Sequence, residues 1–460
     1  MEKNNGNSDF FNFMADLKNL IRTKKTKVAV IGLGYVGLPT AVEIAGAGYK
    51  VFGIDIKKQR VNSVNKGKSY ILDVSSKVLK RVIKSKKLKA FNNYLPLKNA
   101  NIVLICVPTP LDKNKVPDVS YIRSTTEEIA KYLHRGQLII LESSTYPGTT
   151  REIILPELEK PIRQAQGKRL KVGRDFYLAF SPERIDPGNK EYKLKNVPRV
   201  VGGITKKCTK LATEFYRTFI SGQVMSLSSA EAAEMTKLLE NTFRLVNISM
   251  INELALLCGK MGIDIWEVIE GAKTKPYGFM PFYPSPKLGG HCIPLDPFYL
   301  SYKAKEYNFW TRFIELAGEI NNQMPHVVVT MVIWALNSLN PKLKMNPKPI
   351  SGSKILVWGV SYKKDIGDTR ESAAFDIIPD LLRKGAKIDY FDPFVKEFKV
   401  DNKTLKSIRY TPQFLKNYDL VLILTDHSGF DYNKLAKNSK LVVDTRNAIK
   451  SRKYKNVSWF

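Results

Sequence analysis

The segment LGGHCIPLDPF, at residues 288–298, contains the residue types best suited to covalent chemistry in this chain. Cys292 follows His291 and a pair of glycines, and Asp296 stands four residues further on. A cysteine of ordinary pKa is mostly protonated at neutral pH, yet it is intrinsically a strong nucleophile. The glycines leave space for a substrate to approach the sulfur. We therefore expect a nucleophile loop here, with Asp296 orienting a water molecule or holding a cation.

The other cysteines do not indicate a metal centre or a disulfide framework, because no two of them form a CxxC pair. The four cysteines are Cys106, Cys208, Cys258 and Cys292. The four histidines are also far apart, so a zinc site would require ligands that only folding brings together. The sequence predicts no metal and a reduced, cytoplasmic location.

A glycine turn near the N-terminus has the pattern of a dinucleotide-binding site. The turn GLGYVG lies between a predicted strand at residues 27–31 and a predicted helix at residues 39–47. Its glycines are Gly32, Gly34 and Gly37. The next strand, expected over residues 51–56, carries Asp55 near its end, where a carboxylate can bind both ribose hydroxyls. Because Asp55 would repel a 2′-phosphate, we expect NAD rather than NADP.

Further apolar runs predict strands over residues 101–107, 137–141 and 177–180, alternating with charged helical segments as in a parallel sheet. The loops VPTP, ESSTYPG and FSPER follow these strands, at the edge where open α/β sheets bind ligands. We predict cofactor contacts in these loops, in the glycine turn and at the acidic strand end. They are Gly32, Gly34, Tyr35, Val36, Gly37, Asp55, Arg60, Val107, Thr109 and Thr145.

A long helix is expected in the middle of the chain, from Ser228 and Ser229 as caps to Gly259. Its apolar residues surround most of the helix, which indicates burial between domains or subunits. One polar stripe at spacings i, i+4 and i+7 consists of Lys237, Asn241 and Arg244. A second helical region is expected over residues 303–339, with a kink or break at Pro325.

A second strand–loop–helix–strand unit follows the linker at residues 340–353. Its strands are expected over residues 354–359 and 387–392, the second ending in an aspartate, with a helix over residues 371–382. It lacks GxGxxG and has the polar loop KKDIGDTRES instead, so it reads its ligand differently. We expect an α/β protein with an N-terminal Rossmann domain (1–222), a central helical dimerisation region (223–340) and a C-terminal Rossmann-like domain (341–460).

The net charge of +31 raises the alternative of a nucleic-acid-binding protein. The lysines are spread along the whole chain, however, and no nucleic-acid-binding motif accompanies them. No run approaches the ~20 apolar residues of a membrane span. The amphipathic segment at residues 10–21 predicts a short helix packed on the first domain rather than a membrane anchor. We expect neither nucleic acid nor a membrane as a partner.

The ordered motifs resemble the UDP-glucose/GDP-mannose dehydrogenase family over nearly the whole chain. They are GLGYVGLPTAVEIA with Asp55, VPTP, SSTYPGTT, FSPER, EAAEMTKLLENTFR, GGHCIPLDPFYL and WGVSYKKDIGDTRES. The resemblance implies four-electron oxidation of a sugar C6 hydroxyl to a carboxylate with two NAD, in a homodimer. It also implies that the C-terminal domain binds the nucleotide sugar.

Carried over motif by motif, the resemblance makes Cys292 the thioester-forming nucleophile and Lys237 its main partner. The implied supporting catalytic residues are Asn241, Asp296, Thr145 and Glu183. The implied substrate-binding residues are Glu183, Arg184, Lys237, Asn241, Arg244, Gly289, His291, Lys363, Arg370 and Arg446. Direct acid–base work by His291 is disfavoured, because adjacent residues on an extended segment point opposite ways.

Within the family, HCIPLD resembles the branch that acts on UDP-N-acetylhexosamines, UDP-N-acetylglucosamine above all, in the synthesis of surface polysaccharide precursors. The UDP-glucose and GDP-mannose branches usually have serine and lysine where this chain has His291 and Leu295. Ser285 and Lys287 replace glycines usual in the branch, which leaves UDP-N-acetylmannosamine, UDP-N-acetylgalactosamine and UDP-glucose as rival substrates. A two-electron β-hydroxyacid dehydrogenase is a further alternative, although that class needs neither Cys292 nor a second Rossmann-like domain.

Overall fold

The computed structural model describes residues 8–71, 73–112, 114–160, 169–186, 188–189, 191–290, 292–338, 346–401 and 403–460. The chain forms two compact units. The first unit comprises Met1–Glu240 and Tyr302–Asn308, and the second comprises Asn241–Ser301 and Phe309–Phe460. Each unit has its own sheet and its own apolar core, so each is described separately below.

The first unit contains an eight-stranded sheet in the order β3-β2-β1-β4-β5-β6-β7-β8. Adjacent strands are parallel except for the antiparallel pair of β6 and β7. The strands are β1 (Lys27–Ile31), β2 (Lys50–Ile54), β3 (Leu88–Phe91), β4 (Ile102–Ile105), β5 (Leu138–Leu141), β6 (Tyr177–Phe180), β7 (Arg199–Gly203) and β8 (Val224–Ser226). The predicted strands β1, β2, β4, β5 and β6 are confirmed to within two residues at each end.

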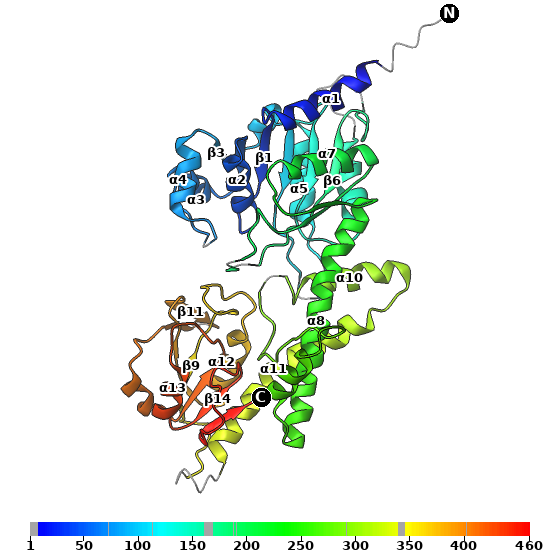
Figure 1. Ribbon diagram of the computed structural model, residues 1–460. Helices are drawn as coiled ribbons and strands as arrows, with labels where there is room; N and C mark the ends of the chain where they lie inside the picture. Colours follow the sequence, from blue (N-terminus) through cyan, green and yellow to red (C-terminus); the bar gives the residue numbers. More distant parts are fainter. Residues whose placement is uncertain are drawn as a thin grey trace, which may run out of the picture. The chain divides into compact units, whose positions relative to one another are not determined.

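Helices flank the sheet of the first unit (Figure 1). They are α1 (Ser8–Arg22), α2 (Gly37–Gly46), α3 (Lys58–Asn65), α4 (Ser76–Lys84), α5 (Ser120–Ala130), α6 (Leu155–Leu158) and α7 (Lys206–Arg217). Leu17 and Ile21 of α1 are buried in the core that α2, α4 and α7 also line. The predicted helix at residues 10–21 therefore packs on the first unit, as expected from its apolar spacing.

The second unit contains a five-stranded parallel sheet in the order β10-β9-β13-β14-β15. Its strands are β9 (Lys354–Trp358), β10 (Lys387–Phe391), β13 (Leu420–Ile423), β14 (Val442–Asp444) and β15 (Val457–Trp459), and β11 (Glu397–Val400) and β12 (Lys403–Lys406) form a separate antiparallel pair. Helices α12 (Ala374–Arg383) and α13 (Tyr432–Asn438) also belong to it. The predicted second α/β unit is confirmed, with α12 beginning three residues later than expected.

The central helices are α8 (Ala230–Met261), α9 (Ile265–Lys273), α10 (Asp296–Ala304) and α11 (Arg312–Asn337). Ser229 caps α8, because its Oγ accepts the N–H of Ala232 at 3.1 Å, as the sequence predicted. Helix α11 continues through the buried Pro325, so a break there is excluded. The backbone leaves helical geometry instead at Asn308, in the left-handed conformation (φ +53°).

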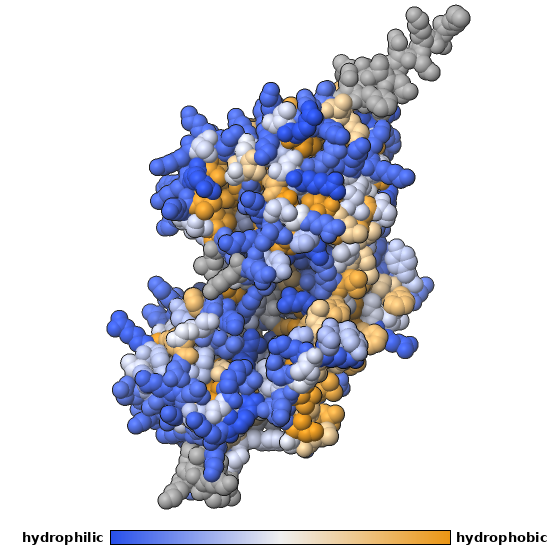
Figure 2. Space-filling view, in the orientation of Figure 1, coloured by the Kyte–Doolittle hydropathy of each residue, from blue (hydrophilic) through white to orange (hydrophobic). Residues whose placement is uncertain are grey.

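The surface is largely hydrophilic on the face shown in Figure 2, in agreement with the net charge of +31. Within the described ranges, no helix combines the length and the apolar character that crossing a bilayer demands. The fold is the expected α/β arrangement with a parallel sheet in each unit and helices between the two sheet-forming segments of the chain.

Candidate functional site

The glycine turn of the first unit has the backbone geometry that a dinucleotide requires. Gly32 has a φ of +89°, a conformation that L side chains rarely adopt. A Cβ on Gly37 would lie 1.8 Å from the carbonyl oxygen of Gly32, so only glycine allows α2 to start this close to the turn. A Cβ on Gly34 would meet nothing within 4 Å, so the backbone is open to a ligand at that position. These three positions fit a pyrophosphate at the N-terminus of α2.

Asp55 lies just beyond β2 with 5% of its surface exposed, beside the glycine turn. Its Oδ2 accepts the backbone N–H of Leu33 at 2.9 Å, which ties the carboxylate to the turn. The Arg60 guanidinium pairs with the same oxygen at 3.2 Å. Tyr70, which the sequence did not indicate, donates its hydroxyl to the carbonyl of Leu33 at 2.7 Å, and burial and Asp55 raise its pKa to about 12. Asp55 is thus placed to accept ribose hydroxyls of NAD.

Tyr35 and Val36 stand within the turn itself, Tyr35 exposed and Val36 directly before the first residue of α2. The loops after β4 and β5 are tied together at the adjacent edge of the sheet. Ser143 donates its hydroxyl to the carbonyl of Val107 at 2.8 Å, and Thr109 donates to the carbonyl of Ser144 at 2.7 Å. The predicted contacts Val107, Thr109 and Thr145 therefore belong to neighbouring loops of the same sheet edge.

A carboxylate that the sequence did not indicate holds the segment after Thr145. Glu234 of α8 is fully buried and accepts the N–H of Gly148 at 2.6 Å. Its other oxygen accepts the N–H of Thr150 at 2.9 Å and the hydroxyl of Thr150 at 2.6 Å. Thr145 in turn shares a hydrogen bond of 2.7 Å with Thr149. Glu234 thereby anchors the SSTYPGTT segment to the helix that carries Lys237.

Lys237 lies one turn after Glu234 on α8 and is only 6% exposed, so it is not an ordinary surface lysine. Burial raises the pKa of Glu183, and the positive charge of Lys237 opposes that shift. The structure therefore brings Glu183, Arg184 and Lys237 into one region of the first unit. Arg184 donates to both carboxylate oxygens of Glu240 on α8, at 2.5 and 3.2 Å.

The thiol of Cys292 lies in a tight turn directly before α10. The carbonyl oxygen of Cys292 accepts the N–H groups of Leu295 and Asp296, at 3.1 and 2.8 Å. Asp296 is the first residue of α10, and its Oδ2 accepts the side-chain N–H of Asn241 from α8 at 2.6 Å. The second unit thus positions Asn241, Cys292 and Asp296 together. His291 lies outside the described residues.

The glycines before Cys292 rest against the loop of residues 361–372, which contains the KKDIGDTRES motif. The N–H of Gly290 donates to the carbonyl of Arg370 at 2.9 Å. A Cβ on Gly289 would lie 2.5 Å from the Cβ of Tyr362, so the two segments could not approach this closely with a larger residue. Arg370 pairs with Asp368 through a bond of 2.7 Å. The loop that contains Cys292 is therefore supported by a loop of the C-terminal sheet.

A pocket of about 1010 Å³ opens within the second unit, large enough for a nucleotide sugar. Four predicted substrate residues line it, namely Arg244, Gly289, Lys363 and Arg446. Lysines and arginines outnumber acidic residues in its wall, and the basic side chains are Arg244, Lys287, Lys363, Lys364, Arg446, Lys450 and Arg452. The indole of Trp266 stacks on Tyr283 with ring centroids 5.7 Å apart. Such a basic pocket with aromatic side chains suits a phosphorylated, ring-containing ligand.

Ser285 and Lys287, which replace glycines usual in the resembling branch, do not strain the loop. Neither has a positive φ, so the main chain does not need glycine at these positions. Lys287 pairs with Asp376 of α12 at 2.7 Å and with Glu371 at 4.0 Å. The Oγ of Ser285 is buried without a hydrogen-bond partner, at the wall of the pocket.

Comparison with known proteins matches three successive segments of the chain to models of one family. Models of the UDP-glucose/GDP-mannose dehydrogenase family match residues 26–220 (NAD binding domain), 231–323 (central domain) and 356–451 (UDP binding domain). The UDP-N-acetyl-D-mannosamine dehydrogenase of Pyrococcus horikoshii is 36% identical, with 92% of this chain and 96% of the relative covered. The UDP-N-acetyl-D-glucosamine 6-dehydrogenase of Pseudomonas aeruginosa is 34% identical, with 94% and 97% covered.

A solved structure of the UDP-D-ManNAc dehydrogenase from Pyrococcus horikoshii superimposes with a TM-score of 0.82, at 33% identity, over 94% of this chain and 98% of that one. The glycine turn, Asp55 and the basic pocket agree with the NAD-binding and UDP-binding assignments of the matching models. The chain therefore belongs to the UDP-glucose/GDP-mannose dehydrogenase family and is an NAD-dependent nucleotide-sugar dehydrogenase.

Proposed function

We propose that this protein oxidises the C6 hydroxyl of a UDP-N-acetylhexosamine to a carboxylate, in two oxidation steps that pass through a thioester on Cys292. The observation that carries this proposal is the placement of Cys292 in the second unit. The thiol precedes a helix whose first residue, Asp296, is held by Asn241, and its loop borders a basic pocket of nucleotide-sugar size. A two-electron dehydrogenase of the β-hydroxyacid class has no need of this arrangement.

The proposed reaction consumes one water and two NAD, and releases two NADH and three protons for each sugar. The glycine turn and Asp55 would hold NAD, which would supply the hydride acceptor for both oxidation steps. The Cys292 thiolate adds to the intermediate aldehyde to form a thiohemiacetal, and removal of the second hydride leaves a thioester. Water then cleaves the carbon–sulfur bond and restores the thiol. Asp296 orients this water through the carboxylate that Asn241 fixes.

The first unit supplies the remaining proposed catalytic residues, which are Lys237, Thr145 and Glu183. A protonated lysine stabilises the negative charge that develops on the substrate oxygen. The low exposure of Lys237 strengthens this interaction, because water does not screen it. We assign the hydroxyl of Thr145 and the carboxyl of Glu183 to proton movement at the water. Glu183 suits this role because burial raises its pKa towards the range of a general base.

We propose UDP-N-acetylglucosamine as the leading substrate, on the HCIPLD pattern of the nucleophile loop. UDP-N-acetylmannosamine is the second candidate, because dehydrogenases named for it are as similar to this chain as those named for UDP-N-acetylglucosamine. Relatives named for the first sugar are 33 to 36% identical, and two named for the second are 32 and 34% identical. The product is a uronic acid nucleotide, a precursor of acidic surface polysaccharides. Within the described residues, the thiols of Cys106, Cys208, Cys258 and Cys292 form no disulfide, which suits a cytoplasmic enzyme.

We further propose that the protein acts as a homodimer through the C-terminal half of α8. Exposed apolar side chains repeat along one face of this helix. They are Phe243, Met250, Leu254, Leu257 and Met261, at spacings of seven, four, three and four residues. Apolar residues also gather near this end of α8 on the face shown in Figure 2. A stripe of this length is typical of a helix that a second subunit covers.

The first experiment measures NADH formed per sugar consumed, with purified protein and each UDP-sugar separately. We expect two NADH per UDP-N-acetylhexosamine in the parent protein. Cys292→Ala should lose net turnover to the acid by at least a thousandfold, because no thioester can form. Cys258→Ala is the matched control, because Cys258 is another partly exposed cysteine and lies on α8. This variant should retain activity.

One NADH per sugar, or turnover of Cys292→Ala equal to that of the parent, would overturn the thioester mechanism. The ratio of kcat/KM for the two epimers decides between UDP-N-acetylglucosamine and UDP-N-acetylmannosamine. Turnover of UDP-glucose alone would move the chain to a different branch of the family.

A further inference from the structure

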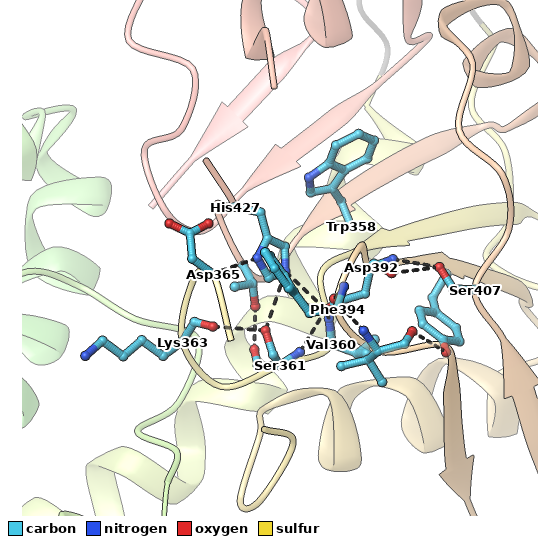
Figure 3. A network of polar contacts seen from close by, with 12 residues as sticks. Trp358, Val360, Ser361, Lys363, Asp365, Asp392, Phe394, Ser407 and His427 are labelled. Atoms are coloured by element: carbon cyan, nitrogen blue, oxygen red, sulfur yellow. Dashed lines mark hydrogen bonds and ion pairs between the residues drawn. The ribbon is translucent and has the colours of Figure 1, made fainter. Parts of the chain in front are cut away.

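The C-terminal sheet contains a fully buried imidazole and carboxylate that the proposed reaction does not use. Asp392 follows β10 and His427 follows β13, and these two strands flank β9 on opposite sides. The side chains of both residues are completely buried, and the Nε2 of His427 lies 3.1 Å from the Oδ2 of Asp392 (Figure 3). Neither residue lines the pocket. Their contacts show what this pair holds in place.

The hydrogen bonds of His427 fix its tautomer. Its Nδ1 lies 3.0 Å from the backbone nitrogen of Asp365, and a backbone N–H can only donate. Nδ1 therefore accepts, and the proton is on Nε2, where it is donated to Asp392. The imidazole thus connects a carboxylate on one side with the main chain of a loop on the other.

Asp392 occupies the position in the second unit that Asp55 occupies in the first, at the end of the second strand. Its Oδ2 accepts the N–H groups of Val360 and Ser361, at 2.9 and 3.1 Å. Its Oδ1 accepts those of Phe394 and Val395, at 2.8 and 3.1 Å. Burial alone would raise the pKa of Asp392, but the hydrogen bonds from His427 and the backbone lower it. The protein itself supplies five hydrogen-bond donors to this carboxylate. Asp392 therefore anchors a loop and does not bind the hydroxyls of a ribose.

The anchored loop carries groups that border the pocket. The carbonyl of Ser361 accepts the hydroxyl of Thr425 at 2.6 Å, and the hydroxyl of Ser361 donates to the carbonyl of Lys363 at 3.0 Å. Asp365 has a φ of +63°, and its carboxylate accepts the N–H and the hydroxyl of Ser428, at 2.8 and 2.7 Å. In Figure 3, the carbonyl of Lys363 joins this network while its ammonium group points away from it.

We propose that His427 is a positioning residue for nucleotide-sugar binding: with Asp392, it holds residues 361–365 so that Tyr362 and Lys363 form one wall of the pocket. The same loop supports the nucleophile loop, since Tyr362 packs on Gly289 and Gly290. This inference rests on the proposed function only in the identity of the ligand. Loss of the Nδ1 acceptor should loosen the loop, because it leaves the N–H of Asp365 without this partner. Loss of the Nε2 donor should matter less, because Asp392 keeps its four backbone donors.

Two conservative variants separate the two hydrogen bonds of the imidazole. The side-chain oxygen of asparagine can replace Nδ1 as the acceptor for the Asp365 N–H, so His427→Asn should retain the loop. The amide nitrogen of glutamine can replace Nε2 as the donor to Asp392, so His427→Gln loses the acceptor and leaves a buried N–H unpaired. We expect His427→Gln to raise KM for the UDP-sugar and the Kd for UDP about tenfold. His427→Asn should stay within about threefold of the parent.

In both variants, we expect KM for NAD to remain unchanged, because the glycine turn and Asp55 belong to the first unit. Near-ultraviolet circular dichroism checks that the second unit is folded, since all five tryptophans of the chain lie in it. Ser428→Ala removes an exposed contact to Asp365 without changing the core, and should raise the Kd for UDP two- to threefold even if the His427 variants fail to fold.

Equal effects of His427→Gln and His427→Asn, a parallel rise of KM for NAD, or a fall in kcat at unchanged KM would overturn the inference. If the His427 variants do not fold, an unchanged Kd for UDP in Ser428→Ala would overturn it as well. The calorimetric Kd for UDP distinguishes this failure from failure of the proposed reaction. A parent protein that binds UDP but oxidises no UDP-sugar would disprove the proposed function while leaving the comparison of the two variants valid.

Discussion

Lys287, like Ser285, stands where the branch that this chain resembles usually has glycine. Its ammonium group lies at the wall of the basic pocket and is held by Asp376 and, at longer range, by Glu371. The side chain is only 13% exposed, whereas the Asp376 side chain is 46% exposed. A positive charge in this position attracts the diphosphate of a nucleotide sugar, and its acidic partner competes with that diphosphate.

We therefore predict opposite effects from the two sides of this ion pair. Lys287→Met should raise KM for the UDP-sugar about fivefold, and Asp376→Asn should lower it about twofold, because the lysine is then released to the diphosphate. Steady-state kinetics at low salt measures both effects, with KM for NAD as the internal control. A rise of KM in both variants would mean that the pair only supports the loop.

At the scale of elements, helix α8 and the segment after β5 are held together by one buried carboxylate. Glu234 accepts two backbone N–H groups and one hydroxyl from Gly148 and Thr150. Burial raises the pKa of Glu234 to about 7 from an ordinary 4.5, although these hydrogen bonds oppose the shift. The folded protein therefore binds this proton more tightly than the unfolded chain does.

A group of this kind contributes stability below its unfolded pKa and loses that contribution as the pH rises through its folded pKa. The free energy of unfolding should thus fall by about 3 kcal/mol between pH 4.5 and 7 through Glu234 alone. Glu234→Gln should lack this component, so its stability relative to the parent should rise with pH. Urea unfolding followed by circular dichroism at several pH values measures the difference.

The test depends on how the free energy of unfolding changes with pH. The hydrogen bonds lost in Glu234→Gln lower this free energy by the same amount at every pH. Glu127→Gln, an exposed substitution on α5, is the control and should follow the parent at every pH. Parallel pH profiles for the parent and Glu234→Gln would disprove the assignment.

At the scale of the whole molecule, the apolar stripe on α8 predicts the assembly. Leu257 is 50% exposed in the single chain, and Leu254 and Met261 lie beside it on the same helix face. Leu257→Glu places a charge where a second subunit would cover it, which costs several kcal/mol in a dimer interface. We expect the mass measured by light scattering to fall from that of two chains to the 52.2 kDa of one.

Leu95→Glu is the matched control, because Leu95 is 56% exposed and belongs to the first unit, whereas the stripe belongs to the second. It should leave the mass at two chains. A parent protein of one chain, or a dimer that Leu257→Glu does not affect, would contradict the proposed interface.

Local patterns in the sequence were sufficient to predict the elements and the family. The two-residue and 3.6-residue apolar periods, the glycines of GLGYVG and the cap at Ser229 act within a few residues of one another. For this reason the first two strands, α2, α8 and the second α/β unit were all predictable. The motif around Cys292 likewise predicts a nucleophile in a loop, and Cys292 lies in a turn before α10.

Only the tertiary structure revealed the buried groups that hold those loops. Glu234 contacts Gly148 across 86 positions, and His427 contacts Asp392 across 35. A single glutamate or histidine has no local signature of such a role, since its partner depends on which strands become neighbours. The order β10-β9-β13 brings the loops of Asp392 and His427 to one sheet edge. The sequence thus determined the types of element and of chemistry, whereas strand order determined which distant polar groups are buried together and must pair.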